Sequence, residues 1–598
     1  MPRPLARLLS SCVLMSLAAG CGAPPEPRTI PQSSPSVSAS ASASPPPAAL
    51  PAQWPYQAPE VVRSSRGMVV TDNSIASKIG RDVLARGGNA VDAAVAAAFA
   101  LAVAYPAAGN LGGGGFAVVR IGAKAHALDF RETAPAAATR DMFLGAGGKA
   151  TSDAHDGTPS AGVPGSVAGL WQLHQNLGSK KLSWAELIAP SIALAEQGML
   201  VDEPFLDTLG RVANRLKKYP TSVAVFFPGG ALPQKGSLWK NPDLAVVLKR
   251  IADAGPKGFY EGATADAIVA QMKADRGWIT HTDLQSYQAK WRTPLEFSYR
   301  GHKLIAMPPP SSGGVTLAMI CNVLQGYDLR SMGWASAQEL HYVFEAMRRA
   351  FAARNAKLGD PDFVAMPLEQ LLGAPWAAEQ RASIKPDRAT PSSEISSAGP
   401  ASGAGPNTTH MSVVDAEGNA VALTTTLNWW YGSGVTVKGA GFVLNNEMDD
   451  FASVPGTANS FGLVQGDANA IAPGKRMLSS MSPTIVVGAD SKVMLVVGAA
   501  GGPMIITSVF QELSNVIDFG LDIGRAVHAP RFHMQHLPDM VVFEKAGLSE
   551  ETARQLLHMG YTLKERGHIA DAPAIGREGN AWVGAAEPRR SGSLAAAP

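Results

Sequence analysis

The sequence predicts a mixed α and β protein whose last third is rich in strands. Apolar residues make up 46% of the 598 residues and charged residues 17%, below the usual charged share of about 25%, so the chain can bury a large core. Helical periodicity marks the region around residue 90, whereas short β-type segments follow residue 407. The 51 basic residues nearly balance the 49 acidic ones, which argues against a nucleic acid as partner.

Residues 1–20 have the pattern of an export signal. Two arginines precede an apolar run that is too short to span a bilayer but suits a secretory signal. The run ends in Leu-Ala-Ala-Gly-Cys, which resembles a bacterial lipobox, so we expect a lipid on Cys21; the alternative is an ordinary signal peptide cleaved nearby. Residues 21–53 are rich in Pro, Ser and Ala, which indicates a flexible tether to the membrane.

Two helices are expected in the first part of the folded chain. Apolar residues recur on one helical face over residues 75–83, with a start signal at residues 73–74 and a stop at residues 87–88. Residues 93–105 carry no charge over thirteen positions. That length favours a helix buried in a soluble core over a membrane span.

A linker and a set of strands follow. Residues 389–406 are rich in Ser, Ala, Gly and Pro, a composition typical of an exposed, poorly ordered linker. Beyond it the pattern predicts strands at 410–415, 420–427, 441–444, 484–487 and 493–497, the last two as a hairpin, and a final helix at 504–517.

The sequence lacks the motifs that several common kinds of functional site require. The glycines at 112–115 lack the Lys-Ser or Lys-Thr of a phosphate loop, so we expect them to permit close approach beside a strand. His528, His533 and His536 lack zinc-ligand spacing, and no Gly-x-Ser-x-Gly elbow occurs. Only Cys321 remains in the folded part once the signal and the lipid site are set aside, which excludes a disulfide framework.

The informative motif lies where the linker meets the strands. Asn407-Thr408-Thr409-His410 opens a strand, and the next strand ends in Thr424-Thr425-Thr426-Leu427-Asn428. Four further stretches, one before this motif and three after it, complete a pattern that closely resembles the γ-glutamyltranspeptidase family of N-terminal nucleophile hydrolases. The resemblance extends from about residue 63 to nearly the end of the chain. The four stretches are Asp129–Glu132, Asn445–Asp450, Ser479–Thr484 and Gly501–Gly502.

The resemblance implies that the chain cuts itself between Asn407 and Thr408. An N-terminal threonine carries its own base, because its α-amine, with a reference pKa of about 7.7 to 8.0, can take the hydroxyl proton. The implied architecture is α+β, an αββα four-layer sandwich. Residues 54–407 then form a large subunit and residues 408–598 a small catalytic subunit, which share one catalytic domain.

The resemblance also assigns the remaining site residues, position by position. Arg131 matches the arginine that binds the α-carboxylate of the donor, where a planar guanidinium pairs in a bidentate way that Lys would not. The other assignments are Asn428, Glu447 and Asp450 to the α-ammonium, Ser479 and Ser480 to the carboxylate, Gly501 and Gly502 to the oxyanion hole, and Thr426 to contact with the nucleophile Thr408.

The implied activity is a self-processing γ-glutamyltransferase and glutathione hydrolase that needs no metal or organic cofactor. A γ-glutamyl ester forms on Thr408 from glutathione or a related compound and passes to water, an amino acid or a dipeptide. We expect an exported heterodimer in the bacterial periplasm or outer membrane, held only by its lipid anchor. The alternatives are a cephalosporin or glutaryl acylase of the same family, which Arg131 and Asp450 disfavour, and a non-catalytic surface lipoprotein.

Two local departures concern the rim of the site. Residues 455–466 align with the lid loop of bacterial members, and Phe461 stands where some members have Tyr, which leaves an aromatic cover without a hydroxyl. Trp429-Trp430-Tyr431 is bulky beside the active strand. These side chains either shape the acceptor side or simply pack.

Overall fold

The computed structural model describes residues 50–51, 53–395 and 408–598. The predicted signal, the lipid site at Cys21 and the residue before the cut, Asn407, lie outside these ranges. Within them, no helix has the length and apolar character needed to cross a bilayer.

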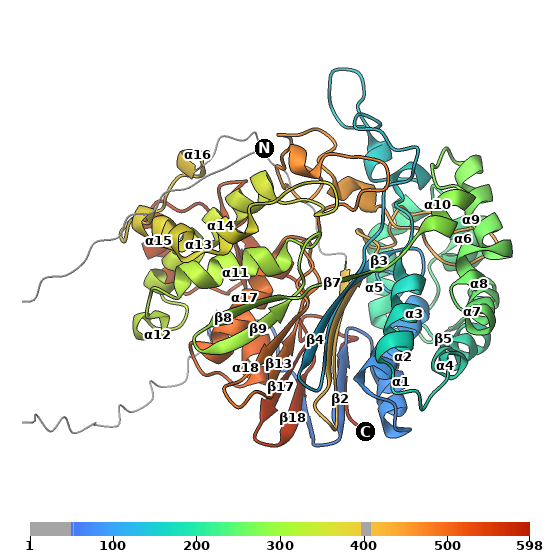
Figure 1. Ribbon diagram of the computed structural model, residues 1–598, viewed down its shortest axis with the longest axis horizontal. Coiled ribbons are helices and arrows are strands. Elements are labelled where there is room, and N and C mark those ends of the chain that lie inside the picture. The colour runs from blue at the N-terminus through green and yellow to red at the C-terminus, as the bar shows by residue number, and fades with distance from the viewer. Residues whose placement is uncertain (1–49, 52, 396–407) are drawn as a thin grey trace, which may run out of the picture. The chain divides into compact units, whose positions relative to one another are not determined.

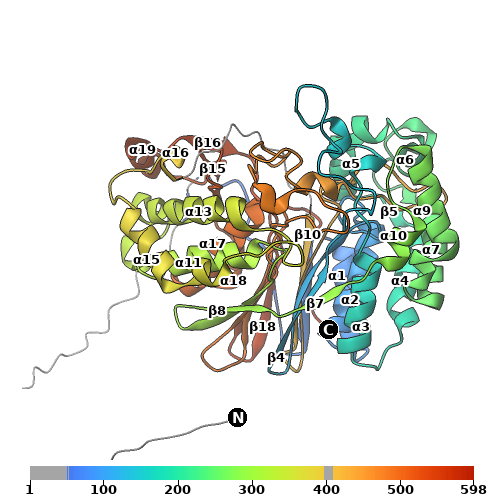
Figure 2. The same cartoon turned by 45° about the horizontal axis from the view of Figure 1, so that its top comes forward.

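Two seven-stranded sheets pack face to face at the centre of the molecule (Figures 1 and 2). Within each sheet, neighbouring strands are antiparallel. The first sheet has the order β1 (Val61–Ser64), β18 (Ala581–Ala585), β17 (Ala574–Glu578), β13 (Val493–Val497), β12 (Thr484–Val487), β9 (His302–Ala306) and β8 (Leu295–Tyr299). The second has the order β19 (Leu594–Ala596), β2 (Gly67–Thr71), β10 (Thr408–Asp415), β11 (Ala420–Thr426), β3 (Gly114–Ile121), β4 (Lys124–Phe130) and β7 (Lys290–Arg292).

Helices cover the outer face of each sheet, which confirms the expected αββα sandwich (Figure 1). The second sheet is covered by α1 (Ser74–Ala85), α2 (Ala90–Ala104) and α3 (Ser166–Leu177), with α4 (Trp184–Gln197), α5 (Glu203–Leu216), α6 (Pro220–Phe226), α7 (Pro242–Ala254), α8 (Lys257–Tyr260), α9 (Gly262–Ala274) and α10 (His281–Ser286) outside them. On the first sheet's side lie α11 (Gly313–Leu324), α12 (Leu329–Met332), α13 (Ala337–Lys357), α14 (Leu368–Leu372), α15 (Ala374–Ser383), α16 (Ser392–Ile395), α17 (Met504–Ile517), α18 (Ile523–His528) and α19 (Glu550–His558). Two small sheets, β14 (Phe532–His533) with β15 (Val541–Glu544) and β16 (Leu563–Arg566), and β5 (Met199–Leu200) with β6 (Leu238–Trp239), complete the fold.

The central strands are buried on both faces. Val413 of β10 belongs to the core beneath α2, whereas its neighbour Val414 belongs to the core between the sheets. This follows from the period of two along a strand, which sends successive side chains to opposite faces. β10 and β11 therefore lie deep in the molecule, where side chains at their ends are held rigidly.

Both helices predicted in the first part of the chain are present. Asn73 caps α1 by accepting hydrogen bonds from two backbone N–H groups of the first turn, which explains the start signal. The uncharged segment forms α2, which starts three residues earlier than expected and is buried along its whole length. An Asn89–Asp92 capping box closes its first turn.

The later elements confirm most of the predicted pattern and correct three points. β10, β11, the β12–β13 hairpin and α17 form where expected. Residues 441–444 do not form a strand, because Gly441 turns at a φ of 72° and only single bridges at Val443 and Leu444 follow. The helix at 504–517 is not the last, since α18 and α19 follow it. Ser392, in the predicted linker, is ordered in α16, where it is buried and bonded to Arg348.

The glycines at 112–115 allow close backbone approach, as predicted. A Cβ atom on Gly113 would lie 2.1 Å from the carbonyl oxygen of Thr426, and one on Gly115 would lie 2.3 Å from that of Thr424. No side chain fits in that space, so β3 can pair tightly with the end of β11. The end of β11 is thereby fixed at the point where the candidate site is built.

Candidate active site

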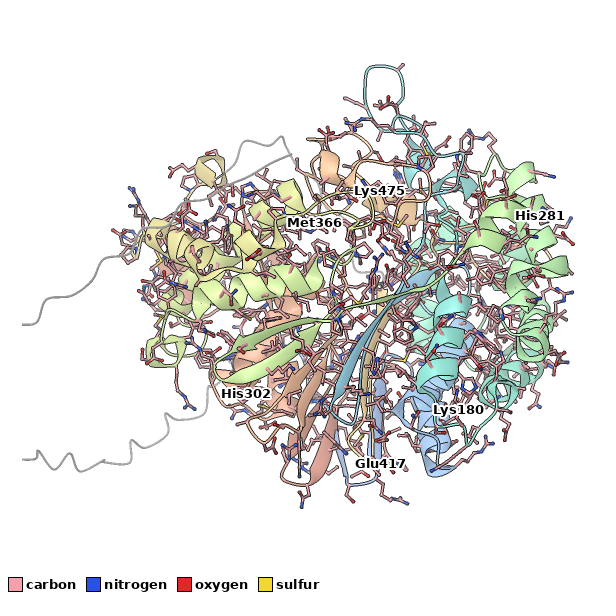
Figure 3. The ribbon with its side chains drawn as sticks, in the orientation of Figure 1. Lys180, His281, His302, Met366, Glu417 and Lys475 are labelled. Atoms are coloured by element: carbon pink, nitrogen blue, oxygen red, sulfur yellow. The ribbon has the colours of Figure 1, made fainter. Side chains whose placement is uncertain are left out.

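The structure sets Thr408 and Thr426 side by side in the second sheet. β10 begins at Thr408 and β11 ends at Thr426, and their antiparallel register places the two residues opposite each other. The Oγ1 atoms are 3.4 Å apart, and both side chains are buried. Figure 3 shows Glu417, in the turn between the two strands, at one end of the sheets and Lys475 at the other end, where the strands bring the two threonines.

Asn428 extends this pair after the chain leaves β11. Its φ of 71° lies in the left-handed region, which Asn tolerates better than most residues. Its backbone N–H donates to Thr426 Oγ1 at 2.8 Å, and its side-chain Nδ2 donates to the carbonyl of Asn446 at 2.9 Å. These two bonds hold the amide of Asn428 beside the threonine pair.

A buried arginine facing three carboxylates forms the second part of the site, which we call the charged cluster. Arg131 follows β4 and is 1% exposed. Its Nη1 lies 2.7 Å from Glu447 Oε2 and 3.6 Å from Glu132 Oε2, and its Nη2 contacts Asp450. Its Nε donates to the carbonyl of Met477 at 3.3 Å. Glu132 belongs to a motif stretch, but no role for it was predicted.

Three carboxylates share one arginine in this cluster, and burial opposes their ionisation. Burial raises the pKa of Glu132 to about 7, against the opposing effect of Arg131. Burial likewise raises the pKa of Glu447 well above its ordinary value and raises that of Asp450, again opposed by Arg131. An additional cation, such as an ammonium group, would therefore be favoured at this point.

The motif at residues 479–484 supplies Ser479 and Ser480, which are both buried. Ser479 Oγ accepts from the backbone N–H of Met481 at 3.1 Å. Ser480 Oγ accepts from Nη2 of Arg354 at 3.2 Å. Ser480 therefore has a charged donor behind it, which sequence reasoning did not identify.

Arg354 is a buried cation that contacts only neutral oxygens among the described residues. Its guanidinium donates to Ser312 Oγ at 3.0 Å, Asn355 Oδ1 at 2.9 Å and Gln465 Oε1 at 3.1 Å, besides its bond to the serine. Burial lowers its pKa to about 10, an effect that Asp450 partly offsets. The sequence held one signal, because Arg354 falls on the buried face of α13, where an apolar residue is expected.

Gly501 and Gly502 lie just before α17 and present two backbone N–H groups. Neither group donates to an acceptor within the described part of the chain. The positive end of the α17 dipole lies beside them and would add to the attraction for a negative oxygen. Gly502 has a φ of 59°, and a Cβ atom there would lie 2.8 Å from the ring of Phe461.

Phe461 covers the site from the loop that aligns with the bacterial lid. Its ring is buried, and its carbonyl accepts from Gln535 Nε2 at 3.2 Å. The neighbouring Ser460 donates to Asp449 and accepts from Trp429 Nε1 at 3.2 Å. Hydrogen bonds therefore hold the loop around Phe461 without an aromatic hydroxyl.

One cavity unites most of the predicted site residues. It is lined by Arg131, Thr408, Thr426, Asn428, Glu447, Asp450, Ser479, Ser480 and Gly502, together with Phe461, Leu463, Met481, Pro503 and Ile505. Gly501 adjoins this lining without being part of it. The space, about 20 Å³, holds about one water molecule.

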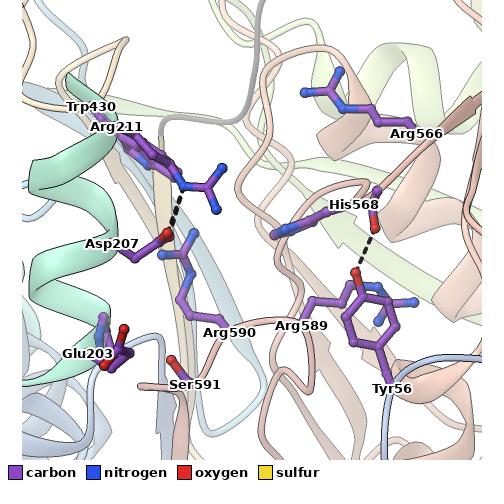
Figure 4. Close-up of a pocket in the computed structure, with 12 residues that line it drawn as sticks. Tyr56, Glu203, Asp207, Arg211, Trp430, Arg566, His568, Arg589, Arg590 and Ser591 are labelled. Carbon is purple, nitrogen blue, oxygen red and sulfur yellow. Dashed lines mark hydrogen bonds and ion pairs between the residues drawn. The ribbon is translucent and has the colours of Figure 1, made fainter.

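The two tryptophans after Asn428 have different surroundings. The ring of Trp429 stacks on His155 with centroids 4.9 Å apart, and the guanidinium of Arg215 lies 5.5 Å from it. Trp430 instead lines a larger cavity of about 560 Å³ beside Arg590 (Figure 4). Both rings pack partly against the core, and Trp430 in addition lines the larger cavity.

The predicted absence of a metal site concerns three histidines in the last third of the chain. His533 bonds Thr507 and Gln535 through its two ring nitrogens, and His528 contacts the carbonyl of Tyr56. In the ranges that the structure describes, no three His, Cys, Asp or Glu residues are grouped so that they could hold a metal ion.

Comparison with known proteins identifies the family. Residues 76–597 match the family model described as gamma-glutamyltranspeptidase. The chain belongs to the γ-glutamyltranspeptidase family. It is 45% identical over 553 residues to a glutathione hydrolase proenzyme of Pseudomonas sp. (strain A14), which covers 90% of this chain and 95% of that protein. It is 43% identical over 540 residues to the glutathione hydrolase proenzyme of Escherichia coli (strain K12), with coverage of 90% and 92%.

A solved structure gives the same fold for this member of the γ-glutamyltranspeptidase family. A cephalosporin acylase from Bacillus halodurans superposes with a TM-score of 0.80 at 28% identity, over 92% of this chain and 99% of that chain. The family resemblance inferred from the motifs is therefore confirmed. Because an acylase has this fold too, the fold alone does not choose between the two activities.

Proposed function

We propose that this γ-glutamyltranspeptidase family member is a self-processing γ-glutamyltransferase and glutathione hydrolase. The observation that carries the proposal is that one cavity holds both the paired hydroxyls of Thr408 and Thr426 and the charged cluster around Arg131. The hydroxyls suit attack on an acyl carbon, and the cluster suits a free α-amino acid end. The relatives named glutathione hydrolase proenzyme support the same activity.

Maturation begins with attack of Thr408 Oγ on the carbonyl carbon of Asn407. The peptide C–N bond breaks as the C–O bond forms, and the hydroxyl proton moves to the departing nitrogen, which becomes the free α-amine of Thr408. Water then hydrolyses the ester and leaves a carboxylate on Asn407. The products, residues 54–407 behind the tether and residues 408–598, remain together as a heterodimer with one catalytic domain.

In the mature enzyme the α-amine of Thr408 takes the hydroxyl proton as the oxygen attacks the γ-carbonyl of the donor. The N–H groups of Gly501 and Gly502 bind the developing oxyanion, and the Thr426 hydroxyl orients the nucleophile. The leaving amine departs with the proton from the ammonium group. Water, an amino acid or a dipeptide then attacks the γ-glutamyl ester and restores Thr408.

The charged cluster recognises the zwitterionic end of the donor. The α-carboxylate binds Arg131 with Ser479 and Ser480, and the α-ammonium binds Asp450 and Glu447 with Asn428. In the free site Arg131 already pairs with these acids, so the donor inserts its two charges between opposite charges of the protein. All reacting groups come from the chain, and the reaction as written uses no cofactor.

The charged cluster also favours this activity over that of an acylase. A glutaryl group lacks the α-ammonium, so it would leave Glu447 and Asp450 without a new cation. We expect kcat/KM for γ-glutamyl-p-nitroanilide to exceed that for glutaryl-p-nitroanilide by roughly 100-fold, the value of one or two charge-assisted contacts. A preference for the glutaryl compound would assign the chain to the acylases.

The direct test uses glutathione. Incubation without glycylglycine should yield glutamate, and incubation with glycylglycine should yield γ-glutamyl-glycylglycine in addition, with the products separated by chromatography. A denaturing gel should show two fragments, and Edman sequencing of the smaller one should begin Thr-Thr-His-Met. A single intact band from an active preparation would exclude self-cleavage.

Arg354 supplies a prediction about donor binding. We propose that its charge polarises the Ser480 hydroxyl toward the donor carboxylate. Arg354→Gln removes the charge but keeps a donor amide, and we expect the KM for a γ-glutamyl anilide to rise about tenfold, because a hydrogen bond to a charged group contributes about 1.5–3 kcal/mol. The value of kcat should change much less, since this residue does not touch the reacting carbonyl.

Two further variants separate positioning from mere packing at Arg354. Arg354→Lys keeps the charge and should recover part of the lost affinity, and Ser480→Ala should make Arg354→Gln less harmful because the relay is already broken. Additive effects of the two single changes on KM would contradict the relay.

We also propose that the chain is exported and anchored to the membrane by a lipid on Cys21. The signal pattern and the bacterial relatives support export. Cys21→Ala should move the activity from the membrane fraction to the soluble fraction after cell lysis, whereas an unchanged distribution would argue for a signal peptide without lipidation.

A further inference from the structure

A buried carboxylate lies behind the first residues of β10, outside the lining of the cavity at the site. Thr409 follows the nucleophile and points to the opposite face of the sheet, the face on which Met411 and Val413 join the core beneath α2. Its hydroxyl donates to Asp72 Oδ2 at 2.9 Å. Asp72 follows β2, the strand that pairs with β10, and is 1% exposed. This carboxylate is thus bound to the residue next to Thr408.

The second oxygen of the Asp72 carboxylate is uncompensated. Asp72 Oδ1 is buried, and no N–H or O–H group of the described residues donates to it. A buried carboxylate is unfavourable unless a cation or hydrogen bonds compensate it. Burial and the nearby Asp571 therefore raise the pKa of Asp72 to about 7, and Arg590 and the bond from Thr409 oppose the rise only in part.

The cation that acts on Asp72 is committed to a different carboxylate. Arg590 donates to Asp571 through Nε at 2.8 Å, and His568 Nε2 lies 2.8 Å from the other oxygen of Asp571. Arg590 and His568 both line the larger cavity (Figure 4), and Asp72 is not part of that lining. Their charge therefore serves Asp571 on the cavity side.

Two further groups complete the surroundings of Asp72. Glu587 acts on it with the same sign as the neighbouring aspartate, but is itself paired with Arg531 at 2.8 Å and Arg589 at 3.1 Å. Tyr105, after the end of α2, stays neutral because burial raises the pKa of its hydroxyl far above the ordinary value. Neither group can supply Asp72 with a positive charge.

Self-cleavage supplies a charge of the missing sign at this place. Before the cut the nitrogen of Thr408 belongs to a neutral amide, and after it the nitrogen is an amine that can take a proton. The new ammonium group appears at the first residue of β10, and the second residue of the same strand already binds Asp72. An ionised carboxylate favours a nearby ammonium, and the ammonium favours the ionised carboxylate.

We propose that Asp72 is the counter-charge of the α-ammonium that self-cleavage creates on Thr408. Thr409 holds the carboxylate in place. The carboxylate stabilises the ammonium from the moment the amine takes the hydroxyl proton until the proton passes to the leaving amine. Asp72 lies outside the cavity that takes the donor, so it is a positioning residue. The inference rests on the proposed γ-glutamyl transfer and identifies the group that tunes its base.

The test is the pH dependence of kcat/KM for γ-glutamyl-p-nitroanilide, whose acid limb reports ionisations of the free enzyme. The α-amine acts as a base only when unprotonated, and a nearby negative charge raises its pKa. Asp72→Asn removes that charge but still accepts from Thr409, so the acid limb should move to lower pH by about one unit. Asp72→Glu restores the charge and should bring the limb most of the way back. The charged cluster is unchanged in both variants, so the difference reports Asp72.

The matched control is Asp415→Asn, at the other end of the same strand. Asp415 is also buried, and it accepts from the backbone N–H of Ala90 at 3.0 Å. The length of β10 separates it from Thr408, which at about 3.4 Å per residue exceeds the screening length of about 8–10 Å. Its acid limb should coincide with that of the wild type.

An Asp72→Asn limb at the wild-type position, or at higher pH, would overturn the counter-charge while γ-glutamyl transfer stands. So would an Asp72→Asn chain that keeps the wild-type urea midpoint but stays uncut, because the residue would then serve cleavage. The same shift is required of Asp72→Ser, which replaces the asparagine variant if that one does not fold. A wild-type enzyme inactive toward the anilide at every pH would overturn the proposed function and this inference together.

Discussion

Thr408→Ala is expected to leave the chain uncut and inactive. The variant lacks the hydroxyl that attacks both Asn407 and the donor, and Thr426, 3.4 Å away, cannot replace it because its own backbone nitrogen stays in a peptide bond within β11. Loss of a nucleophile of this kind lowers kcat by roughly 10⁴-fold to 10⁶-fold. A denaturing gel and a γ-glutamyl anilide assay measure the two effects separately.

Two hydroxyl-preserving changes are the controls for this result. Thr408→Ser retains a nucleophile and should be cut, at a lower rate. Thr409→Ser retains the hydroxyl that donates to Asp72 at 2.9 Å and should mature like the wild type. Cleavage of Thr408→Ala before the same residue would contradict the self-cleavage mechanism and indicate a separate protease.

Arg131→Ala should impair both donor binding and stability. The sequence alone predicts a protein that matures but binds the donor poorly. The structure adds that three carboxylates would lose their shared counter-charge, and breaking a buried ion pair costs about 3–5 kcal/mol of unfolding free energy. We expect kcat/KM for the donor to fall by about 10²-fold to 10³-fold, which corresponds to a similar free energy. The midpoint of urea unfolding should shift to a lower urea concentration.

Arg131→Lys separates the two effects. Lysine keeps the positive charge, which should restore much of the stability, but it lacks the planar fork for bidentate carboxylate binding, so donor affinity should stay low. If Arg131→Ala bound the donor as tightly as the wild type, Arg131 would not be the carboxylate ligand.

The catalytic residues that belong to a sequence motif could be predicted from the sequence, because the motif fixes which residues surround them. Thr408 and Thr426 belong to adjacent strands joined by a short turn, so the hairpin register alone brings them together. Gly502, far away in the sequence, was placed only by the family resemblance. The side-chain distances required the structure.

Arg354 and Glu132 show what sequence reasoning could not reach. Arg354 lies on a helix whose pattern predicts a buried apolar face, and its role depends on a contact with Ser480 across 126 residues of sequence. Glu132 adjoins Arg131 in the chain, yet its raised pKa comes from burial, which no local pattern reveals. The strand expected at 441–444 failed for a local reason, because Gly441 turns the backbone out of the extended region.

The strand order of the two sheets has a consequence for the cut chain. β10 lies between β2 and β11, and β2 precedes Thr408 in sequence whereas β10 and β11 follow it. In the other sheet, β12 pairs with β9 across the same divide. The two polypeptides of the mature protein could therefore separate only by breaking ladders inside both sheets. Mixing two differently labelled mature preparations should yield no hybrid molecules, because the large and small subunits of one molecule would not exchange with those of another.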